Sequence, residues 1–444
     1  MPRVVIVGGG FGGLEVAKGL RRAPADVLLL DRSNHHLFQP LLYQVATAAL
    51  SPADIAAPVR SVLRRQRNTQ VLMAEVHDVD LAGGRVLLAG GASLEYDHLV
   101  LATGSMTSYF GHDEWERLAP GLKTIDDATR IRRNVLLAFE RAECADGAEQ
   151  MRRLLTFVIV GGGPTGVEMA GSIAELAHQA LRRDFRRINP QSARIILIEA
   201  SPSILGGFEP SLARHARRDL IRLGVEVLEG VMVEDLTDEG VSTSQGFLAS
   251  QNVIWAAGVR ATPVARWLQV QPDRMGRVPV EPDLTVASHP KVFVIGDAAL
   301  LAGPGGRPLP GVSPVAMQQG RYVAKVILRR LTGEGSLPPF RYRDKGMLAT
   351  IGRGRAIAQM GRFRFAGLFA WLVWVFVHIL YLVEFRARLI VLTQWAWAYL
   401  TWQRGARLIT GLPEEQTRTL QQPAPGSSSE SESSPLETQR KTPS

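Results

Sequence analysis

Short apolar runs alternate with helix-compatible stretches from the N-terminus to about residue 330. Runs such as 4–7, 27–30 and 157–160 have the character of buried strands, and each is bounded by glycine or by an acid. Strands that alternate with helices form βαβ units with parallel sheets. The pattern therefore predicts an α/β fold over this part of the chain.

One signature occurs twice within this pattern: a buried strand, a glycine-rich turn and the start of a helix. The turns carry the spacing G-x-G-x-x-G at Gly8, Gly10 and Gly13, and again at Gly161, Gly163 and Gly166. The first glycine permits a tight turn, the second lets the backbone approach a pyrophosphate, and the third allows close helix–strand packing. Phosphates would lie at the helix N-terminus, where free N–H groups favour anions. The repeat predicts two Rossmann-like dinucleotide-binding domains.

Each copy is followed by another apolar strand that ends in an acid, Asp31 in the first copy and Glu199 in the second. A carboxylate at this place accepts hydrogen bonds from ribose hydroxyls. Glu199 would also repel a 2′-phosphate, so the second site is expected to prefer NADH over NADPH. A distant arginine that reaches the second site is the alternative.

Three further strands end in turns of small residues. Thr103–Gly104 and Ala257–Gly258 close one strand in each copy, and small residues there let the backbone come close to a ligand. Gly296–Asp297 has no counterpart in the other copy. Its carboxylate suits the ribityl chain of a flavin, although a strand-end Asp is often only a helix cap. We therefore assign FAD to the first site and NADH to the second.

The second glycine motif interrupts the elements of the first site, so the nicotinamide domain is predicted to be inserted into the FAD domain. The expected FAD domain is discontinuous, at 1–112 and 250–330, and the NADH domain covers 113–249. A C-terminal region follows at 331–410.

The segment from Ala366 to Val383 is apolar around its whole circumference apart from His378. A shorter apolar stretch follows, with Trp395, Trp397, Tyr399 and Trp402 and with arginines on both sides. Dense Trp and Tyr beside Arg is typical of a membrane interface. We expect membrane-anchoring helices at about 366–409 that lie in the membrane plane, with a transmembrane hairpin as the second choice and core helices disfavoured. The Ser-, Pro- and Glu-rich tail, 411–444, is expected to be disordered.

Composition narrows the function further. The net charge of +9 fits an anionic membrane surface better than nucleic acid, since no nucleic-acid-binding module is present. Cys144 is the single cysteine, so relatives that pass electrons through a cysteine pair are excluded. The nine histidines are scattered, and His35 and His36 are expected in a polar turn, so no metal site is predicted.

At this point the chain resembles the type II NADH dehydrogenases, which are single-subunit, non-proton-pumping NADH:quinone oxidoreductases of respiratory membranes. The resemblance extends to about residue 410. The segments that resemble the family are the two glycine motifs, Gly296–Asp297, and residues 38–44, 99–105, 255–259 and 315–320. It implies non-covalent FAD, NADH as substrate and a membrane quinone as acceptor.

The resemblance also implies site residues beyond the two loops. Glu168 matches a carboxylate near the nicotinamide–flavin contact; the alternative is an acid in the first turn of a helix. Many relatives carry an Ala-Gln pair where this chain has Ser313–Pro314, which removes one amide that could contact a quinone. Gln318 is therefore the principal residue expected on the quinone side, with Gln319 and Lys345 as further candidates.

The function expected from the resemblance is NADH oxidation through FAD with quinone reduction. Two alternatives remain: an NADH-dependent reductase of a small protein acceptor, and a non-catalytic, membrane-tethered NADH sensor. The expected partners are membrane lipids through the C-terminal region, the quinone pool and a second copy in a homodimer. The expected location is the cell inner membrane, as a peripheral, monotopic protein on the cytoplasmic face.

Overall fold

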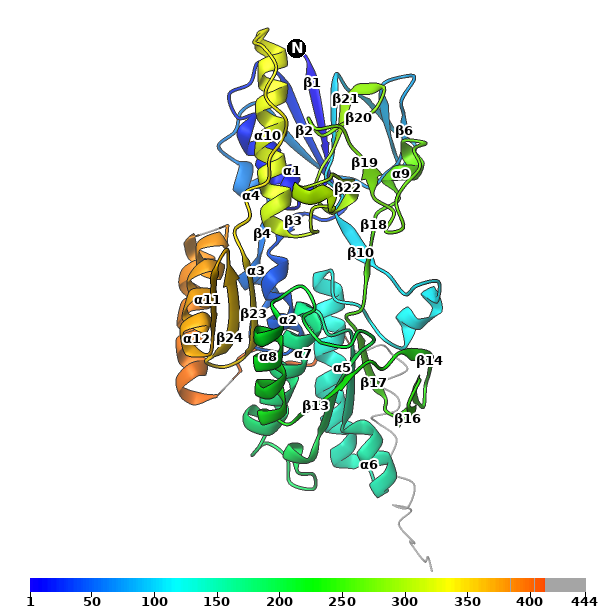
Figure 1. Ribbon diagram of the computed structural model, residues 1–444, viewed down its shortest axis with the longest axis vertical. Helices are drawn as coiled ribbons and strands as arrows, with labels where there is room; N and C mark the ends of the chain where they lie inside the picture. The colour runs from blue at the N-terminus through cyan, green and yellow to red at the C-terminus, as the bar shows by residue number, and fades with distance from the viewer. Residues whose placement is uncertain (384, 403, 412–444) are drawn as a thin grey trace, which may run out of the picture.

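The computed structural model describes residues 1–383, 385–402 and 404–411. The molecule is elongated, with two α/β lobes stacked along its long axis and a pair of helices against one flank (Figure 1). The tail that we expected to be disordered lies outside the described residues, apart from Gly411.

The first lobe is built from the N-terminal segment and a later return segment. The N-terminal segment contributes β1 (Arg3–Val7), α1 (Phe11–Gly19), β2 (Asp26–Asp31), β3 (His35–Leu37), α3 (Pro52–Ile55), β4 (Ala56–Pro58), α4 (Val59–Leu63), β5 (Thr69–Met73), β6 (Val76–Asp80), β7 (Arg85–Leu88), β8 (Ser93–Glu95) and β9 (His98–Leu101). Its helix α2 (Leu42–Ala46) extends down and packs against helices of the second lobe (Figure 1). The return segment contributes α9 (Val264–Trp267), β19 (Val278–Pro279), β20 (Thr285–Val286), β21 (His289–Val294), β22 (Ala299–Leu300) and α10 (Ser313–Thr332).

The six-stranded sheet of this lobe has the order β20-β21-β9-β1-β2-β5. It is parallel except at the β20 edge. Alternate side chains of each strand point to opposite faces, so both faces can be covered. Helices α1 and α10 cover one face, with Ile6 and Val323 in a shared core, and the β6-β7-β8 sheet covers the other through Val86.

The second lobe repeats this plan on a smaller sheet. Its elements are α5 (Ile125–Cys144), α6 (Ala148–Leu154), β11 (Thr156–Val160), α7 (Pro164–Glu175), β12 (Arg194–Glu199), α8 (Pro210–Arg222), β13 (Val225–Glu229), β14 (Val233–Thr237), β15 (Gly240–Thr243), β16 (Gly246–Ala249) and β17 (Asn252–Trp255). The parallel sheet has the order β13-β12-β11-β17. Phe157 and Ile159 face the helices, whereas Val158 and Val160 face the β14-β15-β16 sheet.

Two antiparallel strands, β10 (Ser105–Thr107) and β18 (Val259–Ala261), connect the lobes. Figure 1 shows them running side by side between the upper and the lower lobe. Strand β17 pairs with β11, so the chain returns to the first lobe after Trp255 and not at residue 250 as we expected. The reason is that β17 supplies the edge strand of the second sheet.

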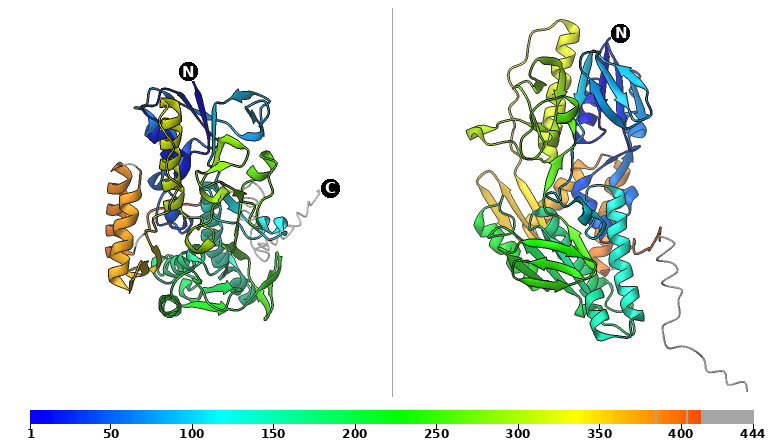
Figure 2. Two further views of the ribbon diagram at one scale, coloured as in Figure 1. Left: turned by 45° about the horizontal axis from the view of Figure 1, so that its top comes forward. Right: turned by 90° about the vertical axis from the view of Figure 1, so that its right-hand side faces the viewer.

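The C-terminal region differs from the helical region that we expected. It begins with an antiparallel sheet of β23 (Met347–Gly352), β24 (Arg355–Met360) and β25 (Phe363–Ala366), followed by α11 (Leu368–Tyr381) and α12 (Phe385–Thr401). The sheet lies between α11 and the second lobe, with β23 against α7 and β24 against α11. Figure 2 shows the helix pair, in orange, on the outside of the molecule.

Helices α11 and α12 each have one face against protein and one face exposed. Ala370, Trp374 and Val391 are buried in the core of the second lobe. A core role, which we had disfavoured, is therefore correct for the inner face, because the sheet of β23 to β25 leaves apolar surface for the helices to cover. Among the described residues, no helix is long and apolar enough to cross a membrane.

Candidate functional site

The first glycine loop joins β1 to α1 and leaves space for a phosphate. Gly8 has a φ of +104°, and a Cβ there would lie 2.4 Å from the Ala102 carbonyl oxygen. A Cβ at Gly13 would lie 1.9 Å from the Gly8 carbonyl oxygen. By contrast, a Cβ at Gly10 would meet no atom of the described chain within 4 Å. Two glycines are thus required by packing, and the third faces open space where a pyrophosphate fits.

Asp31, at the carboxyl end of β2, lies beside this loop. Its Oδ2 accepts a hydrogen bond from the Gly9 N–H at 2.6 Å, and its Oδ1 accepts from the Ser33 N–H at 2.7 Å. His36 packs against the same loop, with Nδ1 3.0 Å from the Gly9 carbonyl oxygen. His36 is buried in β3 against Phe11, so the polar turn that we expected there is wrong.

The second glycine loop, between β11 and α7, has the same geometry. Gly161 has a φ of +108°, and a Cβ at Gly166 would lie 1.8 Å from the Gly161 carbonyl oxygen. A Cβ at Gly163 again meets no described atom within 4 Å. Glu199 Oε2 accepts from the Gly162 N–H at 2.6 Å, as Asp31 does in the first loop. The repeat found in the sequence is therefore also a repeat of local structure.

The strand-end turns meet where the lobes join. Gly104, Gly258 and Gly296 have positive φ values of +72°, +86° and +72°, which glycine adopts without strain. Thr103 Oγ1 lies 2.5 Å from Thr262 Oγ1, which joins the first turn to the return segment. The Asp297 carboxylate accepts from the Ser105 hydroxyl at 2.7 Å.

A cavity opens between the two lobes. This inter-lobe cavity is lined by Gln39, Pro40, Leu42, Tyr43, Thr107, Leu122, Lys123, Thr165, Glu168, Trp255, Ala256, Gly258 and Val259. Its walls come from the helix α2 region, the connecting strands and the start of α7. It therefore lies where ligands held by the two glycine loops would meet.

A second cavity lies beneath the C-terminal helices. This aromatic cavity is lined by Tyr43, Gln44, Ala49, Glu168, Ser172, Glu175, Thr350, Ile351, Gly352, Arg353, Trp371, Trp374, Trp395, Ala398, Tyr399, Trp402 and Arg404. Trp374 stacks on His378 at 4.2 Å between ring centroids and packs against Trp395 at 5.2 Å. The two cavities share Tyr43 and Glu168.

Glu168 projects from α7 between these cavities. It lies beyond the first turn of the helix, so it is not the N-terminal acid of the alternative interpretation. Its Oε1 accepts a long hydrogen bond, 3.4 Å, from the Thr350 N–H. Part of the side chain opens onto the cavities, yet the surrounding protein desolvates the carboxyl and raises its pKa to about 8. The group is therefore mostly protonated at neutral pH.

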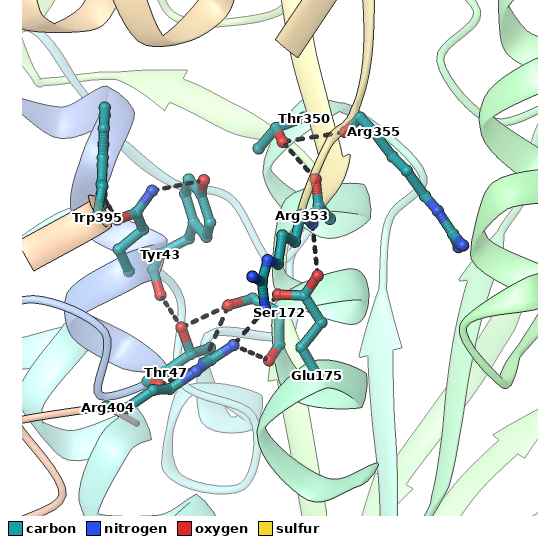
Figure 3. A network of polar contacts seen from close by, with 11 residues as sticks. Tyr43, Thr47, Ser172, Glu175, Thr350, Arg353, Arg355, Trp395 and Arg404 are labelled. Atoms are coloured by element: carbon teal, nitrogen blue, oxygen red, sulfur yellow. Dashed lines mark hydrogen bonds and ion pairs between the residues drawn. The ribbon is translucent and has the colours of Figure 1, made fainter. Parts of the chain in front are cut away.

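A polar network links the C-terminal segment to α2 and α7 (Figure 3). Arg404 donates to the carbonyl oxygens of Thr47 at 2.7 Å and Ser172 at 3.0 Å, and lies 3.5 Å from the Glu175 carboxylate. The Arg353 N–H donates to Glu175 at 2.5 Å. In this way Arg404 holds the end of the C-terminal region against α2 and α7.

Residues 2–320 match the family of pyridine nucleotide-disulphide oxidoreductases. The chain is also 45% identical to the type II NADH:quinone oxidoreductase Ndh of Mycobacterium tuberculosis, over 92% of this chain and 90% of that protein. This chain belongs to the type II NADH:quinone oxidoreductase family. A second relative in that organism, NdhA, is 43% identical over 94% of this chain and 93% of its own length. The fold agrees with that of NDH2 from Plasmodium falciparum in complex with NADH, with a TM-score of 0.82, 20% identity and coverage of 92% and 100%.

Three residues were expected on the quinone side from the family resemblance, and the structure shows the surroundings of each. Gln318 donates through Nε2 to the Arg343 carbonyl oxygen and accepts from the Arg343 N–H, both at 3.0 Å. Buried Gln319 accepts from the Gly296 N–H at 2.7 Å. Lys345 is exposed. None of the three lines either cavity of the described chain.

The family substitution Ser313–Pro314 begins α10, with Pro314 in its first turn and no side chain capping it. The Ser313 side chain is therefore not the helix cap that its residue type favours. Neither Ser313 nor Pro314 lines the inter-lobe cavity or the aromatic cavity.

Sequence reasoning missed several residues that the structure brings to the two cavities. Tyr43, Gln44, Lys123 and Arg404 line these cavities, and no pattern in the sequence indicated a role for any of them. Their partners are distant in the chain: Trp395 Nε1 donates to Gln44 Oε1 at 2.7 Å. The one local signal was a charged residue, Lys123, directly before a helix cap at Thr124.

Proposed function

We propose that this chain is a respiratory flavoenzyme that oxidises NADH through non-covalent FAD and reduces a membrane quinone without pumping protons. The observation that carries the proposal is the pair of cavities with a shared wall. One cavity lies between the dinucleotide loops, and the other lies under an exposed apolar helix pair. Bound FAD supplies the redox chemistry, because it accepts a hydride from NADH and passes two electrons to a quinone.

The first lobe would hold FAD. The open face of the first glycine loop takes the pyrophosphate, Asp31 takes the ribose and Asp297 takes the ribityl region. The residues proposed for this site are Gly8, Gly10, Gly13, Asp31, Thr103, Gly104, Gly296 and Asp297. The proposed FAD domain consists of 1–112 and the return segment from about 256 to 330.

The second lobe would hold NADH on the other side of the inter-lobe cavity. The residues proposed for this site are Gly161, Gly163, Gly166, Glu199, Ala257 and Gly258. Glu199 accepts a hydrogen bond from the Gly162 N–H of the loop, which holds its carboxylate where the adenosine ribose would bind. That charge supports a preference for NADH, since a 2′-phosphate would be repelled.

Glu168 is proposed to hold a proton for the quinone. Its carboxyl is mostly neutral at pH 7 and forms part of the aromatic cavity wall. Because Oε1 accepts from Thr350, the proton belongs on Oε2, the oxygen without that contact. A quinone takes up two protons with two electrons, so a neutral acid beside it is a proton donor of suitable pKa.

The C-terminal helices are proposed to dock in the plane of an inner membrane from the cytoplasmic side. Their outer faces expose large apolar side chains: Leu368, Phe369, Leu372, Phe376, Leu380, Leu389, Leu392, Trp397 and Leu400. Their inner faces are buried against the second lobe, so the folded protein presents the outer, apolar faces of the two helices to its surroundings. Such a face inserts into the headgroup and acyl boundary of a bilayer.

The test is anaerobic. The FAD-loaded protein is mixed with NADH, flavin absorbance is followed, and a soluble quinone is then added. We expect bleaching by NADH and prompt recovery with quinone. Failure of NADH to bleach the flavin would overturn the proposal, and so would bleaching without recovery. Recovery with a ferredoxin but not with quinone would favour the protein-acceptor alternative, and slow turnover with all acceptors would favour the sensor.

A further inference from the structure

Lys123 places an ammonium group at the wall of the inter-lobe cavity. Its Nζ donates to the Ser105 hydroxyl at 3.2 Å, and the Ser105 hydroxyl donates to Asp297 Oδ2 at 2.7 Å. A chain of two hydrogen bonds therefore connects the cavity wall to the carboxylate that closes the proposed FAD site. Among the described residues, Ser105 is the only hydrogen-bond acceptor of this ammonium.

This is an unfavourable place for a cation. Lys123 directly precedes Thr124, the N-cap of the 20-residue helix α5, where the helix dipole is positive. Burial lowers the pKa of Lys123, and only the charge of Asp297 opposes that effect. Two hydrogen bonds hold the backbone at this residue, because the Lys123 N–H donates to Asp127 and its carbonyl oxygen accepts from Gln39.

Lys123 is also the basic group in the wall of the inter-lobe cavity. Among the lining residues of the inter-lobe cavity, it is the single basic side chain and Glu168 is the single acidic one. Because Glu168 is mostly neutral at pH 7, Lys123 is the lining residue that can place a positive charge on this wall. A positive charge with few local partners at a site of low dielectric favours negative charge on whatever occupies the cavity.

We propose that Lys123, held by Ser105 and Asp297, tunes the redox potential of FAD by favouring the reduced over the oxidised cofactor. This inference rests on the proposed function, in which FAD reaches the inter-lobe cavity. Two-electron reduction adds negative charge to the flavin ring system, and the ammonium stabilises that charge. The effect raises the midpoint potential and makes hydride transfer from NADH more favourable.

The test is a dye-coupled reductive titration of the FAD-loaded protein and three variants. Lys123→Met removes the charge at similar length, Lys123→Arg keeps a cation, and Lys291→Met makes the same charge change at an exposed residue of β21. We expect Lys123→Met to lower the ratio of affinities for reduced and oxidised FAD about tenfold, which is about 30 mV for a two-electron couple. Lys123→Arg should restore most of the potential, and Lys291→Met should leave it unchanged.

An unchanged potential in Lys123→Met overturns the inference, and so does an equal shift in Lys291→Met. If Lys123→Met loses FAD on purification, binding of oxidised and of reduced FAD to its apoprotein gives the same ratio directly. The titration uses a chemical reductant, so it is independent of NADH. If NADH does not bleach the wild-type flavin, the proposed function is wrong. The potentials of the variants still test the role of Lys123 in that case.

Discussion

Gly10 and Gly13 stand three residues apart in one loop but are required for different reasons. A Cβ at Gly13 collides with the Gly8 carbonyl oxygen, whereas a Cβ at Gly10 meets no described atom. We expect Gly13→Ala to prevent stable folding. Gly10→Ala should fold with an unchanged apoprotein Tm and bind FAD at least about tenfold more weakly, because its methyl group occupies the pyrophosphate space. Calorimetry and FAD titration measure the two effects.

The second loop provides the control for this pair. Gly163→Ala should leave FAD binding at the wild-type level and weaken NADH binding, since Gly163 has the same open environment in the other lobe. Weakened FAD binding by Gly163→Ala would contradict the assignment of the two loops.

Glu168 gives a prediction about pH. Its folded pKa of about 8 lies above the unfolded value near 4.3, so the folded state binds the extra proton. This contribution to stability is complete below about pH 4 and is lost as pH rises through 8. Between pH 6 and pH 8, the unfolding free energy of the wild type should fall by about 2 kcal/mol relative to Glu168→Gln. Urea unfolding at the two pH values measures this difference.

The same variant separates the two half-reactions. Flavin bleaching by NADH should change little in Glu168→Gln, whereas reoxidation by quinone should slow and lose its pH dependence near 8. A variant that keeps the wild-type pH profile of reoxidation would contradict the proton-holding role.

At the scale of residues, the sequence predicted the glycines and acids of both loops because those requirements are local. Each glycine loop is one turn between one strand and one helix, and its acid ends the strand that follows that helix region in the chain. Lys123 and Arg404 could not be predicted in this way. Their partners, Ser105 and Asp297 for the first and Thr47 and Ser172 for the second, come together only through tertiary packing.

At the scale of elements, the least predictable part was the sheet of β23 to β25. These strands are short, and charged or polar residues interrupt the apolar pattern at Arg355 and Gln359. Their stability comes from burial between α7 and α11, with Ala349, Ile351 and Ile357 in the core. Local periodicity does not reveal such burial. The helices α11 and α12 were predicted because apolar and aromatic residues dominate both segments.

Arg404 fixes the end of the C-terminal region to α2 and α7 and gives an element-scale prediction. Arg404→Met would remove the ion-pair partner of Glu175 and leave Arg353 and Arg355 as the nearby cations, so we expect a loss of about 3 kcal/mol in urea unfolding, the lower end of the usual range for breaking such a pair. The double variant Arg404→Met/Glu175→Gln should recover part of this loss. Arg386→Met, on α12 outside this network, is the control and should have a small effect. Equal loss in the single and double variants would show that the pair is not coupled.

At the scale of the molecule, the apolar face of α11 should determine membrane binding. Phe376 and Leu380, one turn apart, are 68% and 53% exposed. Replacing both by Ser should lower binding to anionic vesicles at least about tenfold, because each large apolar side chain contributes roughly 1.5–3 kcal/mol on burial. Vesicle flotation measures this, and anaerobic bleaching by NADH should remain as in the wild type.

Phe247→Ser on β16 is the matched control, since Phe247 is equally exposed, at 53%, but lies on the second lobe away from the helix pair. Equal loss of flotation in both proteins would indicate nonspecific adsorption and would contradict the anchor.

The whole fold was predictable in outline because one unit is used twice. The doubled signature implied two sheets and an insertion. The predicted residue at which the chain returns to the first lobe was less accurate. Trp255 and Val259 are only four residues apart but belong to strands of different sheets. The turn at Ala257–Gly258 marks the end of the first of these strands, but it does not reveal that the next strand belongs to another sheet.

The interrupted course of the first lobe has a consequence for synthesis of the protein. Strand β21 is internal to the six-stranded sheet, yet it is translated only after the inserted lobe is complete. On the ribosome, the strands β11 to β17 emerge as one uninterrupted unit, whereas β1, β2, β5 and β9 wait for their missing neighbour. The inserted lobe can therefore close its sheet first, whereas the sheet of the first lobe cannot be completed until residue 294 has left the exit tunnel.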